Sequence, residues 1–322
     1  MHQPMVMQVF SLVIPVYGNE GSIPELLATI DSLADKIHTQ HGMALEAVFV
    51  VDGSPDQSFA VLAQRLPAVG FASRLLMHSR NFGSFAAIRT GLGVASGDYF
   101  GVMAADLQEP PKLMLEFLAG FVTGELDVIV GSRESRADPW TSKLASNLFW
   151  RLYRAFVMPD LPPNGVDVFA CNRVFRDHLL SLEEAHSSLV GLIFWLGFRR
   201  GEVSYSRRPR KHGQSGWSLR KKVRYLLDSV FSFTDLPIRL LTLFGMLGLL
   251  FSVPMGLYII LARLIGTITV PGYAATMVAV VFLGAINAVG LGIIGSYAWR
   301  TYENTKRRPL SLVLAERRFP RA

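Results

Sequence analysis

Acidic and amide side chains follow several apolar segments of the chain, and their types suit the binding of a divalent cation. Asp52 comes directly after the apolar run 45–51, and Asp106 and Gln108 follow the run 99–104. Mg²⁺ prefers oxygen ligands and commonly takes only one or two of them from a protein, because water and substrate phosphate complete its shell. We therefore predict that Asp106 and Gln108 hold Mg²⁺ or Mn²⁺ against a diphosphate.

The sequence lacks the glycine-rich loops that bind phosphates in many nucleotide-binding proteins. Neither G-x-G-x-x-G after the first apolar segment nor G-x-x-x-x-G-K-[ST] is present. A loop of backbone N–H groups is therefore not expected to hold the phosphates. This favours a metal held by carboxylate and amide oxygens.

Segments with strand-like and helix-like patterns alternate around these residues. We expect strands at 9–17, 45–51, 74–77, 99–104 and 127–130, with amphipathic helices between them. This alternation predicts an α/β fold with a mainly parallel, doubly wound sheet, in which ligands bind beyond the carboxyl ends of the strands. The polar residues expected at that edge are Tyr17, Glu20, Asp52, Asp106, Gln108 and Arg133.

Charge is distributed unevenly over the 322 residues, which are 50% hydrophobic and carry a formal net charge of +7. Residues 1–198 hold 13 basic and 20 acidic residues, whereas residues 199–224 hold 10 basic residues and 1 acidic residue. The composition excludes a disordered chain, and the single cysteine, Cys171, excludes an internal disulfide framework. Nucleic-acid binding is not expected, because the positive charge lies outside the main domain.

Two stretches without a charged residue, 240–262 and 273–299, are each longer than the about 20 residues that a helix needs to cross a bilayer core. We predict two membrane spans. Basic residues flank their outer ends, so the positive-inside rule places the main domain and both termini on the cytoplasmic side of the inner (cytoplasmic) membrane. No cleavable signal peptide is expected at the N-terminus.

The expected organisation is a main domain over 1–218 with a basic loop at 199–218, an amphipathic helix at 219–236, two spans within 237–299, and a basic, partly disordered tail at 300–322. Residues 142–157 form a second amphipathic stretch. Such helices lie either at the membrane surface or against the domain. We favour the membrane surface for 219–236 and leave both placements open for 142–157.

Several motifs follow one another along nearly the whole chain: SLVIPVYGNEGSI (11–23), VVDGSPD (50–56), RNFGSFAAIRTGL (80–92), AADLQEPP (104–111), VGSR (130–133), NGVDVFACNRVF (164–175) and RRPRKHGQSGWS (207–218). With the two predicted spans, this order resembles the polyprenyl-phosphate glycosyltransferases of glycosyltransferase family 2, which include dolichol-phosphate mannose synthases and bacterial undecaprenyl-phosphate glucosyltransferases. The resemblance implies a GT-A catalytic domain that moves one sugar, with inversion, from a nucleotide-diphosphosugar to a lipid phosphate at the membrane. It favours a UDP-linked hexose and undecaprenyl phosphate as substrates.

The resemblance also assigns roles to residues by their positions in the motifs. The nucleotide-sugar site is implied to contain Pro15, Tyr17, Glu20, Asp52, Asp106 and Arg133, and the metal site Asp106 and Gln108. The acceptor phosphate is implied to bind Arg207, Arg210 and Ser215, and the catalytic residues are Asp167, Arg207 and Arg210. Asp167 then either orients hydroxyl groups or acts as a weak base.

Some positions depart from the family pattern and leave alternatives open. Ala104 replaces the first Asp of the usual Asp-Ala-Asp, and Phe169 replaces a usual Arg. A catalytically weakened transferase that acts as a membrane scaffold is therefore one alternative. A processive polysaccharide synthase is another, although the sequence has no Q-x-x-R-W motif. Homo-oligomer formation is left open.

Several of the chosen residues also have a structural alternative. Asp52 and Asp56 suit the cap of the following helix, and Glu20 suits a first helical turn. Asp167 suits an ion pair with Arg173. The basic cluster 207–222 suits anionic lipids in general as well as one acceptor phosphate.

Overall fold

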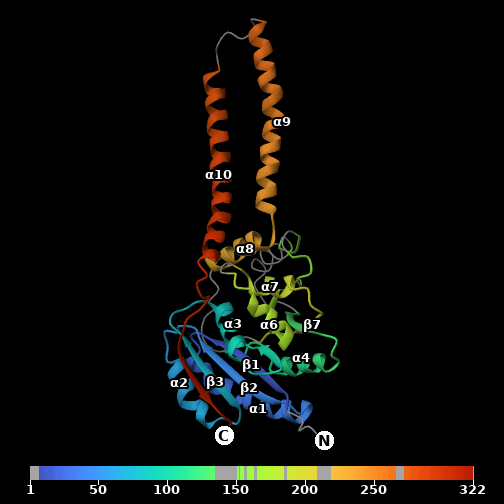
Figure 1. Cartoon of the computed structure of the whole chain (residues 1–322), viewed down its shortest axis with the longest axis vertical. Helices are drawn as coiled ribbons and strands as arrows, with labels where there is room; N and C mark the ends of the chain where they lie inside the picture. The colour runs from blue at the N-terminus through green and yellow to red at the C-terminus, as the bar shows by residue number, and fades with distance from the viewer. Residues whose placement is uncertain are drawn as a thin grey trace.

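Runs of buried aliphatic residues form a central sheet with helices on both faces (Figure 1). The computed structural model describes residues 7–134, 151, 153–155, 158–162, 165–184, 187–208, 219–265 and 272–321. Within these residues the sheet has eight strands, in the order β7-β5-β6-β4-β1-β2-β3-β8. The strands are Val9–Val16 (β1), Ala44–Val51 (β2), Ala72–His78 (β3), Tyr99–Val102 (β4), Val128–Arg133 (β5), Val166–Asn172 (β6), Arg200–Tyr205 (β7) and Val313–Phe319 (β8).

Amphipathic helices cover the sheet, so the domain has three layers. One face is covered by α1 (Ile23–His41), α2 (Ser58–Arg65) and α4 (Lys112–Val122). The other face is covered by α3 (Ser84–Val94), α6 (Arg173–Ser181) and α7 (Leu189–Trp195). Two short 3-10 helices, η1 (Glu20–Ser22) and η2 (Leu66–Ala68), lie beside α1 and α2. The predicted α/β fold class is confirmed.

Two strands run against the direction of their neighbours. β1 to β4 are parallel, as are β5 and β7, whereas β6 is antiparallel to β4 and β5, and β8 is antiparallel to β3. The start of an antiparallel strand lies beside the end of its partner, so Val166 pairs with Ser132 and Val313 with His78. β6 and β8 thereby bring their first residues to the carboxyl edge of the parallel strands. The five predicted strands are confirmed, and β6, β7 and β8 are additional to them.

Two long helices rise side by side from the domain (Figure 1). They are α9 (Leu236–Leu264) and α10 (Tyr273–Thr305), and their segments Leu236–Tyr258 and Phe282–Thr305 are long and apolar enough to cross a membrane. Almost none of the side chains in these segments are buried, unlike those of a core helix in a soluble protein. They are candidate membrane helices, and they overlap the two predicted spans.

The helix α8 (Leu219–Phe233) lies at the base of the two long helices (Figure 1). On one side, Tyr225 packs against buried residues of the domain and accepts a hydrogen bond from Ser188 Oγ at 3.0 Å. On another side, Arg300 of α10 forms an ion pair with Asp228 at 2.7 Å. The alternative of packing on the domain therefore applies to α8, and its contact with a membrane surface stays a prediction. Most of the amphipathic stretch 142–157 lies outside the described residues.

The prediction of a partly disordered tail is wrong. α10 continues to Thr305, and residues Val313–Phe319 form β8 along the outer side of β3. An edge strand leaves a row of backbone N–H and C=O groups unpaired, and an added antiparallel strand satisfies them. The order of the tail thus depends on a partner more than 200 residues earlier in the chain, which its own composition does not reveal.

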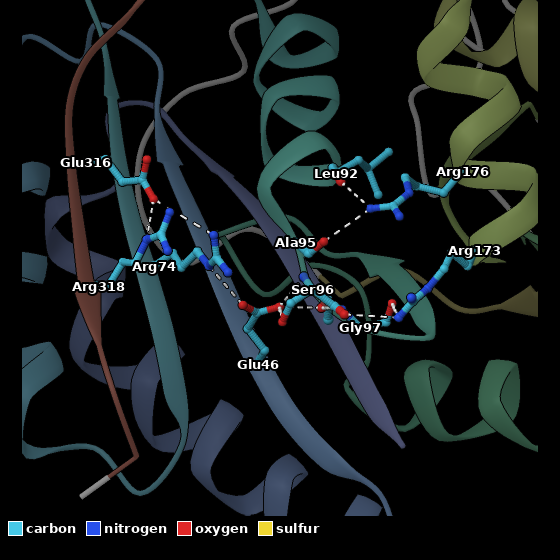
Figure 2. A network of polar contacts seen from close by, with 11 residues as sticks. Glu46, Arg74, Leu92, Ala95, Ser96, Gly97, Arg173, Arg176, Glu316 and Arg318 are labelled. Carbon is cyan, nitrogen blue, oxygen red and sulfur yellow. Dashed lines mark hydrogen bonds and ion pairs between the residues drawn. The ribbon is translucent and has the colours of Figure 1, made fainter. Parts of the chain in front are cut away.

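A buried carboxylate ties these strands together (Figure 2). Glu46 of β2 accepts hydrogen bonds from Ser11 Oγ at 2.5 Å, Ser96 N at 2.8 Å and Arg74 Nε at 3.0 Å. Arg74 of β3 also faces Glu316 of β8 at 3.9 Å. Glu46 therefore links β1, β2 and β3 to the loop before β4, and through Arg74 to the added strand β8.

We expect Glu46→Ala to reduce the free energy of unfolding by about 3 to 5 kcal/mol, because Arg74 and two serine hydroxyls lose a buried partner. Thermal unfolding of the purified protein, followed by circular dichroism, measures the effect. Glu316→Ala removes the more exposed partner of Arg74 and should cost less than about 1 kcal/mol. Equal losses in the two variants would contradict the central place of Glu46.

Candidate active site

Polar side chains from distant parts of the sequence meet at the carboxyl edge of the sheet, where parallel sheets bind their ligands. They form three groups. The β1–β2 loops comprise residues 17–20 and 52–57, and the β4 turn comprises residues 104–109. The third group is the Arg133–Asp167–Tyr205 cluster, contributed by β5, β6 and β7.

Hydrogen bonds join the two β1–β2 loops to each other. Gly18 N donates to Ser54 Oγ at 2.8 Å, and Glu20 N donates to Asp56 Oδ2 at 3.0 Å. In return, Gln57 N donates to Glu20 Oε2 at 3.0 Å. The loops therefore form one surface, in which Glu20 also begins the short helix η1, as the structural alternative for this residue expects.

Pro15 and Tyr17 lie at the same corner of the sheet. Pro15 pairs with Val50 near the end of β1, and Tyr17 beyond the strand is 51% exposed. An exposed aromatic ring of this kind offers a flat apolar face to a ligand. Asp56 accepts from Ser58 N at 3.2 Å, but the N-cap residue of α2 is Gln57, so Asp56 contacts the start of the helix without being its cap. The structure brings Pro15, Tyr17 and Glu20 together, and their contact with a nucleotide stays a prediction.

Asp52 points into the protein. The residue is 2% exposed, and its carboxylate accepts from the backbone N–H groups of Phe82 at 2.9 Å and Gly83 at 2.8 Å. It also contacts His78 Nδ1 at 2.8 Å. Burial raises the pKa of Asp52, but the hydrogen bonds from His78 and the two N–H groups outweigh burial and bring the pKa below its usual value. In this structure its oxygens hold the loop 80–83, and the contact of Asp52 with a nucleotide stays a prediction.

The β4 turn carries the two predicted metal ligands. Leu107 has a φ of 55°, in the left-handed region that non-glycine residues rarely adopt, and it turns the chain sharply between Asp106 and Gln108. Gln108 N donates to Asp106 Oδ1 at 3.3 Å, which keeps both residues on one turn. Backbone strain of this kind clusters at functional sites.

The segment after β7 docks on the β4 turn. Arg208 N donates to Gln108 O at 2.8 Å, and Gln108 Nε2 donates to Arg208 O at 3.3 Å. Arg207 Nη2 donates to Gln108 Oε1 at 2.5 Å. A predicted metal ligand and a predicted acceptor arginine are therefore in direct contact. The other two predicted acceptor residues, Arg210 and Ser215, lie outside the described residues.

Glu109 belongs to this site although the sequence did not single it out. It is 1% exposed, its Oε1 lies 3.9 Å from Arg207 Nε, and its Oε2 has no hydrogen-bond partner among the described residues. Burial and the nearby charge of Asp106 raise the pKa of Glu109 from 4.5 to about 7. In the sequence, only its position next to the predicted metal ligand Gln108 indicates that Glu109 belongs to the site. The sequence alone does not show that its carboxylate is buried.

The β4 turn fits a hard divalent cation. Asp106 carries a carboxylate and Gln108 an amide oxygen, which are ligand types that Mg²⁺ accepts, and the amide oxygen accepts from Arg207 Nη2 in this structure. The unpartnered, buried Oε2 of Glu109 is the kind of atom whose desolvation a nearby cation relieves. Among the residues that the structure describes, no group of three or more His, Cys, Asp or Glu side chains could hold a metal. With two protein ligands, Mg²⁺ commonly completes its coordination shell with oxygens of water and substrate.

The Arg133–Asp167–Tyr205 cluster spans three neighbouring strands. Arg133 donates through Nε and Nη2 to the two carboxylate oxygens of Asp167, and Tyr205 Oη donates to Asp167 Oδ2 at 2.9 Å. Burial and the charge of Asp167 raise the pKa of Tyr205, so the phenol remains a donor. The alternative pair of Asp167 with Arg173 is wrong, because Arg173 pairs with Asp98 at 3.1 Å.

Known proteins resemble this chain over most of its length. Residues 11–181 match the family model of glycosyl transferase family 2. The chain is 32% identical to an uncharacterized glycosyltransferase of Synechocystis sp. over 304 residues, which cover 94% of each chain. It is 34% identical to the putative glycosyltransferase CsbB of Bacillus subtilis over 305 residues, which cover 95% of this chain and 91% of the relative.

Two further comparisons concern a phage protein and a solved structure. The bactoprenol glucosyl transferase of Shigella phage SfV is 27% identical over 311 residues, which cover 95% of this chain and 98% of that protein. The crystal structure of glucosyl-3-phosphoglycerate synthase from Mycobacterium tuberculosis with uridine-diphosphate has a TM-score of 0.47 at 17% identity, over 72% of this chain and 84% of that chain.

We expect Glu109→Gln to stabilise the protein in EDTA at pH 8 and to have little effect near pH 4.5. Glu109 is protonated in the folded protein up to about pH 7 but ionises from pH 4.5 in the unfolded chain, so wild-type stability falls between these values as the pH rises. The amide cannot ionise, and its advantage above pH 7 corresponds to roughly 3 kcal/mol.

Thermal unfolding in EDTA at pH 4.5 and at pH 8 tests this prediction. Glu116→Gln, on the exposed surface of α4, is the control and should leave the pH dependence unchanged. A pH-independent effect of Glu109→Gln would contradict the burial of an ionisable carboxyl group at this position.

Proposed function

Since the chain belongs to glycosyltransferase family 2, we propose that it transfers one hexose, with glucose as the first candidate, from a nucleotide-diphosphosugar to a polyprenyl phosphate such as undecaprenyl phosphate. Its mainly parallel mixed sheet belongs to a GT-A glycosyltransferase domain. Relatives named bactoprenol glucosyl transferase support the choice of sugar and acceptor, because the similarity extends over 95% of this chain and includes the candidate membrane helices. A UDP-linked donor follows from the resemblance of the motifs.

The contact between Arg207 and Gln108 carries this proposal. Gln108 belongs to the turn proposed to bind the donor diphosphate, and Arg207 is proposed to bind the acceptor phosphate. A guanidinium group suits phosphate oxygens because it offers several donors in a fixed plane. The two phosphate-bearing substrates then meet at a single point of the carboxyl edge.

The chemistry requires two anions to approach each other. The acceptor phosphate is already a nucleophile, so a strong general base is less necessary than it is for a hydroxyl group. Asp167 accordingly acts as an orienting residue, because Arg133 and Tyr205 already donate to its carboxylate. Attack in line on the anomeric carbon, opposite the leaving diphosphate, inverts the configuration.

Asp106 and Gln108 are the residues that would hold a divalent cation, Mg²⁺ or Mn²⁺, in the β4 turn. When bound, such a cation neutralises charge on the departing diphosphate. Arg207 contributes positive charge from the acceptor side. The carboxylate of Glu109, 3.9 Å from Arg207 Nε, helps to hold the guanidinium group in place. Electrostatic stabilisation of this kind is usually the largest part of catalysis at such sites.

The reaction takes place at the cytoplasmic face of the inner membrane. α10 leads directly to β8, whose first residue pairs with the last residue of β3, so the membrane helices connect to the domain at the carboxyl edge. Arg239, Arg300 and the cluster 306–308 flank the two spans on that side, as the positive-inside rule requires. A lipid phosphate in the bilayer surface then lies on the same side as the proposed site.

Transfer can be measured with purified protein, undecaprenyl phosphate, Mg²⁺ and radiolabelled UDP-glucose, with label in the lipid extract as the readout. We expect Asp106→Asn to reduce turnover about 10²- to 10³-fold, because one charge of the metal site is lost. Asp160→Asn removes a largely exposed carboxylate and should leave turnover unchanged.

The outcomes separate this function from its alternatives. A folded wild-type protein that transfers no label from any common nucleotide sugar would support the scaffold alternative. Formation of long glycans instead of one transferred sugar would support a processive synthase.

We also expect Arg207→Lys to raise the KM for undecaprenyl phosphate about tenfold and to change the KM for the donor little, because an ammonium group cannot bind two phosphate oxygens in one plane. Arg208→Lys is the matched control, since Arg208 docks on the turn through its backbone. A rise in the donor KM alone would contradict the acceptor role of Arg207.

A further inference from the structure

The strand β8 leads back from the candidate membrane helices to the edge of the catalytic sheet (Figure 1). It pairs with β3 from Ser73 opposite Phe319 to His78 opposite Val313, and Ser79 N donates to Leu312 O at 2.9 Å. Figure 2 shows the same two strands joined through Arg74. Val313, the first residue of β8, therefore lies beside His78, the last residue of β3, at the carboxyl edge of the sheet.

A chain of side-chain hydrogen bonds begins at this point. Ser311 Oγ lies 2.7 Å from Thr90 Oγ1, Thr90 Oγ1 lies 3.0 Å from His78 Nε2, and His78 Nδ1 lies 2.8 Å from Asp52 Oδ1. The ring protonated at Nδ1 satisfies every member: His78 donates to Asp52 and accepts from Thr90, which accepts from Ser311. His78 and Asp52 are 1% and 2% exposed, so water does not compete for the hydrogen bond between them, and the bonds to Thr90 and Ser311 are partly buried.

Asp52, which His78 holds in place, in turn holds a loop. Its two oxygens accept from Phe82 N and Gly83 N, in the loop 80–83 that follows β3. Gly53, with a φ of 56°, packs so closely on this loop that an added Cβ would lie 2.3 Å from the carbonyl carbon of Arg80. Loop 80–83 is therefore held from one side by Asp52 and from another by the backbone at Gly53.

Loop 80–83 follows β3 and packs on Gly53 of the β1–β2 loops, which also carry Tyr17, Glu20 and Asp52, and Pro15 lies near the end of the adjoining strand β1. Resting on the proposed function, which makes this corner the donor site, we propose that Ser311, Thr90 and His78 are positioning residues. They fix Asp52 and the loop 80–83, so that the C-terminal segment forms part of the structural support of the nucleotide-binding corner.

The order Asp, His and hydroxyl is also that of a hydrolytic triad. Here the hydroxyl group of Thr90 contacts both His78 and Ser311, and His78 is buried, so the arrangement supports a loop and does not activate a nucleophile. Of the residues in this hydrogen-bond chain, only Ser311 lies outside residues 11–181, which match the family model.

Thr90→Val and Ser311→Ala test the proposal in the full-length protein, because each removes one hydroxyl group and leaves His78 and Asp52 in place. Hydrogen exchange at Phe82 and Gly83 reports on the loop, and calorimetric titration with UDP reports on the nucleotide corner. We expect faster exchange at these two amides and about fivefold weaker UDP binding, as for the net loss of one buried hydrogen bond. The KM for undecaprenyl phosphate should stay unchanged.

Arg318→Ala is the control, because it alters β8 at a largely exposed side chain outside the hydrogen-bond chain. A merely stabilising role of β8 predicts that all three variants lower the melting temperature alike without a specific change at Phe82 and Gly83, and this result would overturn the proposal. Unchanged exchange and unchanged UDP binding in Thr90→Val and Ser311→Ala would do the same.

Failure of the proposed function gives a different result. If the wild-type protein binds no UDP, the donor assignment is wrong, while hydrogen exchange at Phe82 and Gly83 still decides whether Ser311 and Thr90 hold the loop.

Discussion

Compensation of buried negative charge is the constraint on which the carboxyl edge of this protein depends. Asp52 after β2 and Glu109 in the β4 turn are buried carboxylates, whereas Asp167 near the start of β6 is more exposed, and each of the three contacts groups from a distant segment. A carboxylate removed from water is costly unless cations or N–H groups surround it. His78 and loop 80–83, Arg207, and Arg133 with Tyr205 meet this need. Of the three, Glu109 is the one with a carboxylate oxygen that has no hydrogen-bond partner among the described residues, and it belongs to the β4 turn that carries the two predicted metal ligands.

The mixed direction of the sheet makes this arrangement feasible. In an entirely parallel sheet, only strand ends reach the ligand-binding edge. The antiparallel strands β6 and β8 add strand starts to it, so Asp167 arrives from the start of β6 and Ser311 from the approach to β8. The same reversal connects the membrane helices to the edge where the substrates are proposed to meet. The topology thus places the proposed reaction site on the side of the domain from which the candidate membrane helices extend.

The docking of Arg207 and Arg208 on Gln108 gives the two proposed substrate sites a shared boundary. The proposed transfer needs few protein groups, because an acceptor phosphate is already nucleophilic and a diphosphate is a good leaving group once its charge is balanced. The protein contributes position and electrostatics, and most of its polar side chains at this edge hold one another in place.

The sequence by itself determined what depends on local pattern. Alternating periodicities gave the parallel strands, long uncharged stretches gave the two candidate spans, and the motif around Asp106 and Gln108 gave the β4 turn. Tertiary structure decided what depends on distant partners. Asp52 is turned inward, and Asp167 pairs with Arg133 and not with Arg173. Glu109 is buried near Arg207, and the tail is ordered as β8. These outcomes depend on burial and on pairing between segments far apart in the chain, and neither can be predicted from the residues that are neighbours in the sequence.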